Sequence, residues 1–199
     1  MAIRTISNAG GNFSATATWT EGVVPTNADD VVATATSGQL TVDVSSVCQS
    51  IDFTNYVSTL TMNNTLTVGN GTATARVVKL VAAMTITTTA GTPLLVINSA
   101  ATMTSSGKTW PYALSFTGAF TATLVDNWAV TGMLSSLSGT RTINSFTLTI
   151  SNGLTVTATI AGTTNLVMNG TGTWSGSSTI PISNNLTFNT AGTITVSGQ

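Results

Sequence analysis

Short runs in which apolar residues alternate with polar ones, mostly threonine, recur along the whole chain. They are separated by asparagine, glycine and serine, which readily adopt the conformations of tight turns. A period of two places alternate side chains on opposite faces of a β-strand. The clearest runs are residues 40–44, 58–62, 65–68, 146–150, 154–157 and 193–196. The sequence therefore predicts an all-β protein built from short strands with one solvated face.

The composition separates this chain from helical and from disordered proteins. Threonine supplies 43 of the 199 residues, and β-branched side chains lose rotamer freedom in a helix. Charged residues make up only 6% of the chain and the mean hydropathy is +0.36, whereas disordered chains are rich in charge and poor in apolar residues. The length suits one domain, or one short repeat array, with a substantial core.

Several classes of function are disfavoured by what the chain lacks. The five basic residues are dispersed and the net charge is −1, so no surface for nucleic acid is expected. Without histidine, Ser-His-Asp and Cys-His catalysis and the usual zinc sites are excluded. No apolar stretch approaches the roughly 20 residues that span a bilayer, and the first residues do not form a secretory signal. We expect no cofactor, no metal site, and no membrane or nucleic-acid partner.

Internal similarity indicates a repeat array. The segment at residues 150–156 returns at 182–188, with a looser copy at 62–68. Thr-X-Thr pairs recur with an average step of about 18 residues, which suits one coil of a β-solenoid. These pairs begin at Thr65, Thr85, Thr102, Thr121, Thr140, Thr155, Thr171 and Thr193.

The distribution of charge divides the chain into two parts. Equivalent side chains of stacked coils lie about 4.8 Å apart, where like charges repel by roughly 1–3 kcal/mol. No charged residue occurs from Thr142 to Gln199, while five of the six acidic residues lie between Glu21 and Asp52. We expect residues 1–38 to form an irregular N-terminal cap and residues 39–199 to form a single β-solenoid body. An antiparallel β-sandwich is the alternative fold.

The N-terminal segment, residues 10–43, carries a pattern that covers about a sixth of the chain. The pattern comprises Gly11, Asn12, Ser14, Thr18, Trp19, Gly22, Val24, Pro25, Asp29, Asp30, Val31, Thr41, Val42 and Asp43. It resembles the opening segment of many bacterial surface and phage-encoded right-handed parallel β-helix proteins. Phe13 stands where that family usually has tryptophan, and Glu21 stands where it usually has glycine. The resemblance implies a right-handed parallel β-helix and says little about function.

Five residues of this segment are expected to build the cap. Phe13 and Trp19 are large enough to plug the open first coil, and Pro25 would end a strand that proline cannot continue. Asp29 and Asp30 are suited to accept hydrogen bonds from backbone N–H groups in the turn before Val31.

Carboxylates are the remaining candidates for catalysis. Glu21, Asp29, Asp30, Asp43 and Asp52 could supply the acid–base pair of a polysaccharide-cleaving enzyme. Their concentration near the N-terminus is better explained by turn capping and solubility, and the body lacks the cluster of acids and bases that a catalytic groove collects. We therefore predict no enzymatic activity.

Aromatic side chains are densest at residues 110–128, and they suggest a contact surface. Trp110, Tyr112 and Trp128 are the candidate interface residues. In the alternative interpretation, Phe116 and Phe120 fill the interior while Trp110 and Tyr112 belong to a loop.

The leading functional hypothesis is a non-enzymatic virion protein of a bacteriophage: a surface fibre, spike or capsid-decoration component. It would act by contact with copies of itself and with other virion proteins, with a host-surface glycan as a further partner, in the virion or outside the cell without a signal peptide. The alternative is an extracellular binding module, either a glycan-binding adhesin or an ice-binding protein whose Thr-X-Thr pairs form a flat face.

Overall fold

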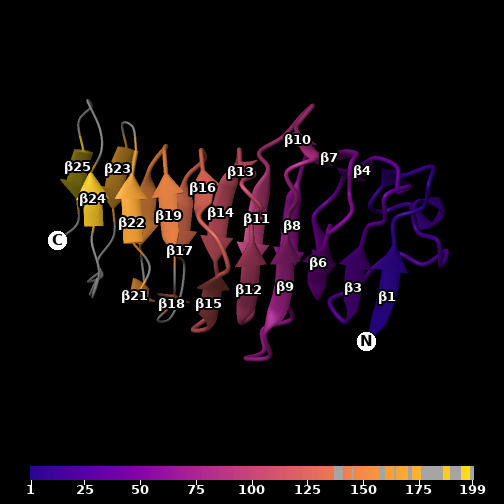
Figure 1. Ribbon diagram of the computed structural model, residues 1–199, viewed down its shortest axis with the longest axis horizontal. Coiled ribbons are helices and arrows are strands. Elements are labelled where there is room, and N and C mark those ends of the chain that lie inside the picture. Colours follow the sequence, from indigo (N-terminus) through magenta and orange to yellow (C-terminus); the bar gives the residue numbers. More distant parts are fainter. Residues whose placement is uncertain are drawn as a thin grey trace.

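The computed structural model describes residues 1–136, 141–144, 146–156, 160–163, 165–169, 172–175, 186–188 and 194–197. The predicted all-β parallel solenoid is confirmed, because every pair of neighbouring strands in its sheets is parallel and the strands stack along the long axis (Figure 1). One 3-10 turn, η1 (Thr16–Thr18), is the only helical element of the described residues. None of the helical structure described is long and apolar enough to cross a membrane.

The chain passes through the sheets in a fixed order. Sheet 1 contains β1 (Ala2–Thr5), β3 (Asp29–Val32), β6 (Ser50–Asp52), β9 (Arg76–Lys79), β12 (Ala101–Thr104), β15 (Thr121–Leu124), β18 (Arg141–Asn144) and β21 (Ile160–Gly162). After its strand in sheet 1, each coil adds a second strand, and along the chain these second strands form two separate sheets. Sheet 2N contains β2 (Gly11–Asn12), β4 (Leu40–Val42), β7 (Thr59–Met62) and β10 (Thr85–Thr87). Sheet 2C contains β13 (Thr109–Trp110), β16 (Trp128–Val130), β19 (Thr147–Ile150), β22 (Asn165–Met168) and β24 (Leu186–Phe188).

From β3 onward, sheet 3 completes each described coil before the chain returns to sheet 1. It contains β5 (Ser46–Cys48), β8 (Thr65–Val68), β11 (Leu94–Ile97), β14 (Ala113–Phe116), β17 (Leu134–Ser136), β20 (Leu154–Val156), β23 (Gly172–Ser175) and β25 (Ile194–Ser197). A parallel stack of this kind pairs each coil with the coils before and after it.

Alternation along each strand builds the core. In sheet 3, register-paired leucines of successive coils point inward and are buried: Leu66, Leu95, Leu114, Leu134 and Leu154. Sheet 1 contributes a matching buried row: Val31, Ile51, Val78, Met103 and Leu124. Most of the intervening residues are at least partly exposed, so threonine can occupy them without leaving a buried hydroxyl unpaired. Ser115, between Leu114 and Phe116, is an exception: it is buried and its hydroxyl has no hydrogen-bond partner in the described structure.

The coil is longer than the sequence pattern predicts. Leu114, Leu134 and Leu154 are register partners, so a coil takes about 20 residues here rather than 18. The Thr-X-Thr pairs gave the wrong step because they mark strands of different sheets rather than one position in the coil. Thr65 lies in sheet 3, Thr85 in sheet 2N and Thr121 in sheet 1. The pairs beginning at Thr140, Thr171 and Thr193 start outside the described residues.

The three similar segments do not all occupy equivalent places. Residues 62–68 and 150–156 both span the corner that leads into sheet 3, by way of β8 and β20. In the copy at 182–188, Leu186 pairs with Leu166 in sheet 2C instead. Similar turn and strand residues therefore serve different corners of the solenoid.

Parallel pairing begins inside the predicted cap. Strands β1 and β3 both lie within residues 1–38, and they pair over four residues from Ala2 opposite Asp29 to Thr5 opposite Val32. The N-terminal segment therefore supplies strands of sheet 1 as well as the chain that covers them.

Candidate functional surfaces

Two aromatic side chains plug the N-terminal end of the solenoid. The rings of Phe13 and Trp19 meet edge to face with their centroids 5.0 Å apart, and each side chain is 2% exposed. The Trp19 Nε1–H donates a hydrogen bond to the Phe13 carbonyl at 3.0 Å. A buried tryptophan with its polar atom satisfied is a stable plug.

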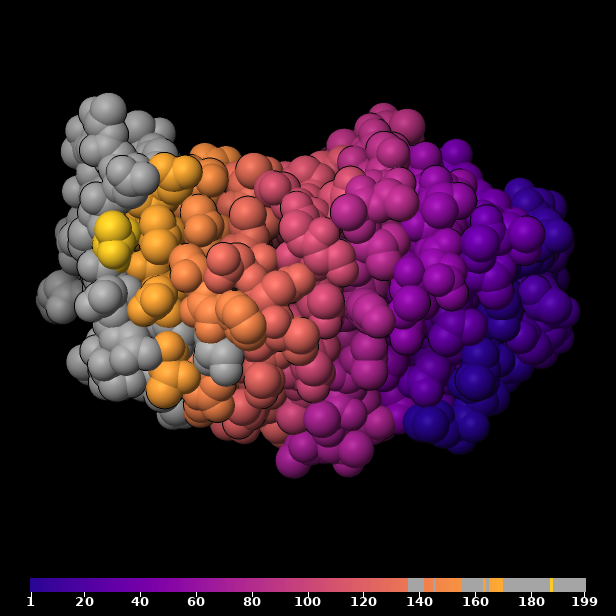
Figure 2. Space-filling model, in the orientation of Figure 1, coloured from indigo at the N-terminus to yellow at the C-terminus, as the bar shows by residue number. Residues whose placement is uncertain are grey.

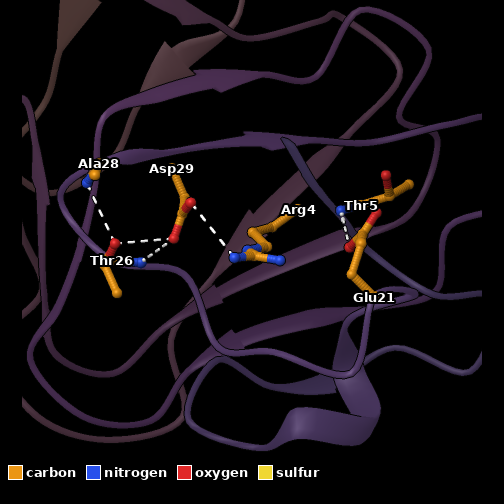
Figure 3. Close-up of polar contacts among 6 residues, drawn as sticks. All are labelled: Arg4, Thr5, Glu21, Thr26, Ala28 and Asp29. Carbon is orange, nitrogen blue, oxygen red and sulfur yellow. Dashed lines mark hydrogen bonds and ion pairs between the residues drawn. The ribbon is translucent and has the colours of Figure 1, made fainter. Parts of the chain in front are cut away.

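The outer edge of β1 is covered by the cap rather than left open. Thr20 N–H donates to the Thr5 carbonyl at 2.9 Å, and Ser7 N–H donates to the Thr18 carbonyl at 2.8 Å. The Thr5 N–H donates to Glu21 Oε2 at 2.8 Å (Figure 3). The carboxylate thus takes the place of a neighbouring strand's carbonyl. Covering an edge in this way prevents other chains from pairing with it.

Asp29 holds the turn that leads into β3. Its Oδ2 accepts hydrogen bonds from the Thr26 N–H at 3.0 Å and the Thr26 hydroxyl at 2.8 Å, and its Oδ1 lies 3.5 Å from Arg4 Nη2 (Figure 3). Pro25 is buried immediately before this turn. Asp30 makes no comparable contact: within the described part of the chain its buried Oδ1 has no hydrogen-bond partner.

Most acidic side chains of the protein are bound to backbone N–H groups. Oxygens of Glu21, Asp29, Asp43, Asp52 and Asp126 accept such bonds from Thr5, Thr26, Ser14, Thr54 and, for Asp126, both Ser105 and Ser106. Among the residues described, no three His, Cys, Asp or Glu side chains come together as a metal-binding group. The carboxylates therefore act one at a time, each holding a turn or an edge.

Hydrogen bonding also changes the acidity of three of these groups. Burial by itself would raise the pKa of Glu21, Asp29 and Asp43, but the hydrogen bonds from Thr5, Thr26 and Ser14 outweigh it and lower each pKa. In the folded protein these side chains therefore stay ionised at lower pH than in the unfolded chain.

Acid is expected to destabilise the protein through these three carboxylates. A lowered folded-state pKa stabilises the fold fully above the unfolded-state pKa, and that stabilisation is lost as the pH falls through the folded-state pKa. The midpoint of urea unfolding should thus fall as the pH is lowered from about 5 to about 2. Asp43→Asn should have a lower midpoint at neutral pH and a shallower decline, because one titrating group is gone. A midpoint that stays constant across this range would contradict the argument.

The aromatic interface prediction is wrong for both tryptophans. Trp110 is 0% exposed and Trp128 is 1% exposed, because each occupies an inward position of its strand in sheet 2C. The Trp110 Nε1–H donates to the Ala113 carbonyl at 3.1 Å. Tyr112 is half-buried at the following corner, and its ring stands at 89° to that of Trp110. Of the three candidates, Tyr112 alone remains available for a surface contact.

The threonines do not gather into one flat face. In sheet 2N, Thr41, Thr61 and Thr87 lie in register, but the Gln39 side chain donates hydrogen bonds to the Thr41 and Thr61 hydroxyls at 3.2 and 3.1 Å. Thr61 is only 2% exposed. The other counted Thr-X-Thr pairs within the described residues lie on different sheets, so they do not extend this row into one face.

One coil carries a projecting loop that the sequence reasoning missed. The segment 88–93, between β10 and β11, is organised by Asn63. Asn63 Oδ1 accepts hydrogen bonds from the N–H groups of Thr89 and Ala90 at 3.0 and 3.2 Å. Gly91 has φ +77° and crosses the Asn63 carbonyl so closely that a Cβ there would overlap it. The sequence gives one signal for this loop: Thr88 and Thr89 are followed by Gly91, shortly before Pro93.

A second projection follows β8 in the same region of the chain. In segment 69–75, the Ser99 hydroxyl accepts hydrogen bonds from the N–H groups of Asn70 and Thr72 at 3.1 and 3.3 Å. Arg76 Nη2 donates to Asn70 Oδ1 at 3.2 Å. Figure 2 shows magenta projections from the upper and lower outlines at this part of the rod. Both loops present uncharged polar groups on a rigid support, which is a common setting for recognition.

Comparisons with protein families, with curated proteins and with solved structures give no match to this chain. A function can therefore be inferred only from the surfaces described above.

Proposed function

We propose that this protein is a non-enzymatic structural component of a bacteriophage particle: a surface fibre, spike or capsid-decoration element that associates with copies of itself and with other virion proteins. The observation that carries the proposal is the use of its acidic side chains. Five of the six bind backbone N–H groups at separate turns or edges. Carboxylates used in this way support a rigid scaffold and leave little for acid–base catalysis.

The uncharged side of sheet 1 is the surface best suited to self-association. From β12 onward its outward row consists of Thr102, Thr123 and Asn144, which are register partners. An acidic and a basic residue, Asp52 and Lys79, lie opposite each other on the earlier coils of the same sheet. A second copy can pack on this row without desolvating a charge from it, a step that is costly for unpaired ions. Arg141, the first residue of β18, is the one charged residue in the described strands of sheet 1 from β12 onward.

Light scattering behind size exclusion, with negative-stain images, tests this proposal. We expect a rod-like or ring-like homo-oligomer whose mass is nearly independent of salt, because uncharged contacts are not screened. Thr102→Lys should split the oligomer. Val57→Lys is the matched control, since Val57 is 61% exposed but lies on the N-terminal coils. A monomer at every concentration would contradict the proposal and favour the binding module, which a glycan array would then test.

Catalysis is tested separately with polysaccharide substrates. We expect no release of reducing sugar from the wild-type protein beyond that from Asp43→Asn, because the Asp43 carboxylate is bound to the Ser14 N–H and hydroxyl at 3.1 and 2.6 Å. Release that is abolished by Asp43→Asn would make the protein an enzyme.

A further inference from the structure

Three asparagines of the chain precede glycine, and the structure gives two of them opposite environments. These are Asn70, Asn152 and Asn169; Gly170, which follows Asn169, lies outside the described residues. An Asn-Gly pair can deamidate when the backbone nitrogen of the glycine attacks the side-chain amide carbon of the asparagine. Glycine offers no side chain to obstruct the attack, so hydrogen bonding and mobility of the two residues decide the rate.

At Asn70 both reacting groups are engaged. The Gly71 N–H donates a hydrogen bond to the Asn98 carbonyl at 2.8 Å. The Asn70 Oδ1 accepts hydrogen bonds from the Thr72 hydroxyl at 2.8 Å and from Arg76 Nη2 at 3.2 Å. The attacking nitrogen and the side chain that it must reach are thus each held by other partners, and reaction requires the 69–75 loop to open.

At Asn152 neither group is held in this way. Asn152 is exposed at the corner between β19 and β20. Its neighbour Gly153 has φ +123° and accepts a bond from the Leu134 N–H at 3.0 Å through its carbonyl. Within the described residues, the Gly153 N–H donates no hydrogen bond and the Asn152 side chain makes none. Gly153 itself is buried, but its nitrogen is unpaired among the described residues and belongs to the residue next to the exposed Asn152 side chain.

We propose that Asn152 is a site of spontaneous deamidation in the folded protein, and that the fold protects Asn70 from the same reaction. The Gly153 nitrogen loses its proton to base and bonds to Asn152 Cγ, the Cγ–Nδ2 bond breaks, and ammonia leaves. Water then opens the cyclic imide at either carbonyl, giving aspartate or isoaspartate. The net change is asparagine and water to an acid and ammonia, with no oxidant or cofactor.

The product matters because of where it forms. Residues 142–199 contain no charged side chain, so the new carboxylate is the first charge in that part of the solenoid. Isoaspartate also adds one carbon to the main chain at a corner whose Gly153 carbonyl binds Leu134 of the preceding coil.

Peptide mapping by mass spectrometry during incubation at mildly alkaline pH tests the proposal. In the folded protein, conversion at Asn70 should be at least about tenfold slower than at Asn152, because it waits for a local opening. In denaturant the two sites should convert at similar rates. Asn152→Gln should abolish the product at this position and leave the unfolding midpoint unchanged.

Two results would overturn the inference. One is equal conversion of Asn70 and Asn152 in the folded protein, which would mean that the contacts of Asn70 give no protection. The other is an unmodified Asn152 after the denatured control has reacted fully. Both are independent of whether the protein self-associates, so the test does not depend on the proposed function.

Discussion

Replacing Trp19 by alanine is expected to lower the free energy of unfolding by about 3–5 kcal/mol, the range observed for large-to-small changes at buried aromatic sites. The ring is 2% exposed and packs edge to face on Phe13. Its removal opens a cavity at the end of the first coil and leaves the Phe13 carbonyl without its donor. Chemical denaturation monitored by circular dichroism measures the loss.

Two further variants separate the contributions of the plug. Trp19→Phe keeps most of the apolar volume but loses the indole N–H, so it should cost less than Trp19→Ala. Val23→Ala, at a side chain 45% exposed in the same segment, should change stability by less than about 0.5 kcal/mol. A loss below about 1 kcal/mol for Trp19→Ala would show that the ring does not plug the solenoid.

Trp110→Ala should be similarly costly, with an expected loss of about 3–5 kcal/mol. The side chain is 0% exposed in sheet 2C, and its indole N–H is satisfied by the Ala113 carbonyl. The cavity would lie inside the stack, where the coils on either side limit collapse. Thermal and urea unfolding of the variant would show the loss as an earlier transition.

Tyr112→Ala is the matched control for Trp110. Tyr112 stands at the corner that follows β13 and is half-buried, so its replacement should cost clearly less stability. If instead Trp110→Ala leaves stability intact and weakens self-association, Trp110 would be a contact residue after all. That result would contradict the burial seen in the structure.

The fold could be predicted because period-two alternation and turn residues both act locally. The coil length could not, since a half-exposed strand looks the same in every sheet. For Trp128, the alternation of apolar residues along the strand predicts burial better than its aromatic character does. Trp128 and Val130 flank Ala129, which is the alternation of an inward-facing strand, and that parity already places the indole inside.

The N-terminal closure shows a different limit of prediction. Phe13 and Trp19 could be chosen as plugs from their size and from their place before residues 40–44, the first clear alternating run of the sequence. The contact of Glu21 with the Thr5 N–H could not, because the two residues meet only when the chain folds back along β1. The contacts of Asn63 with residues 88–90 are of the same kind.

One coil is longer than the others, because 29 residues separate the register partners Leu66 and Leu95 in sheet 3, and this has a practical meaning for protein engineering. Leu66 and Leu95 remain register partners although the chain between them forms the 69–75 and 88–93 projections. Closing a longer loop costs little additional entropy, about 0.6 kcal/mol for each doubling of its length. These two corners are therefore natural positions for grafting foreign peptides, such as epitopes or affinity tags, onto a scaffold whose stacking is left undisturbed.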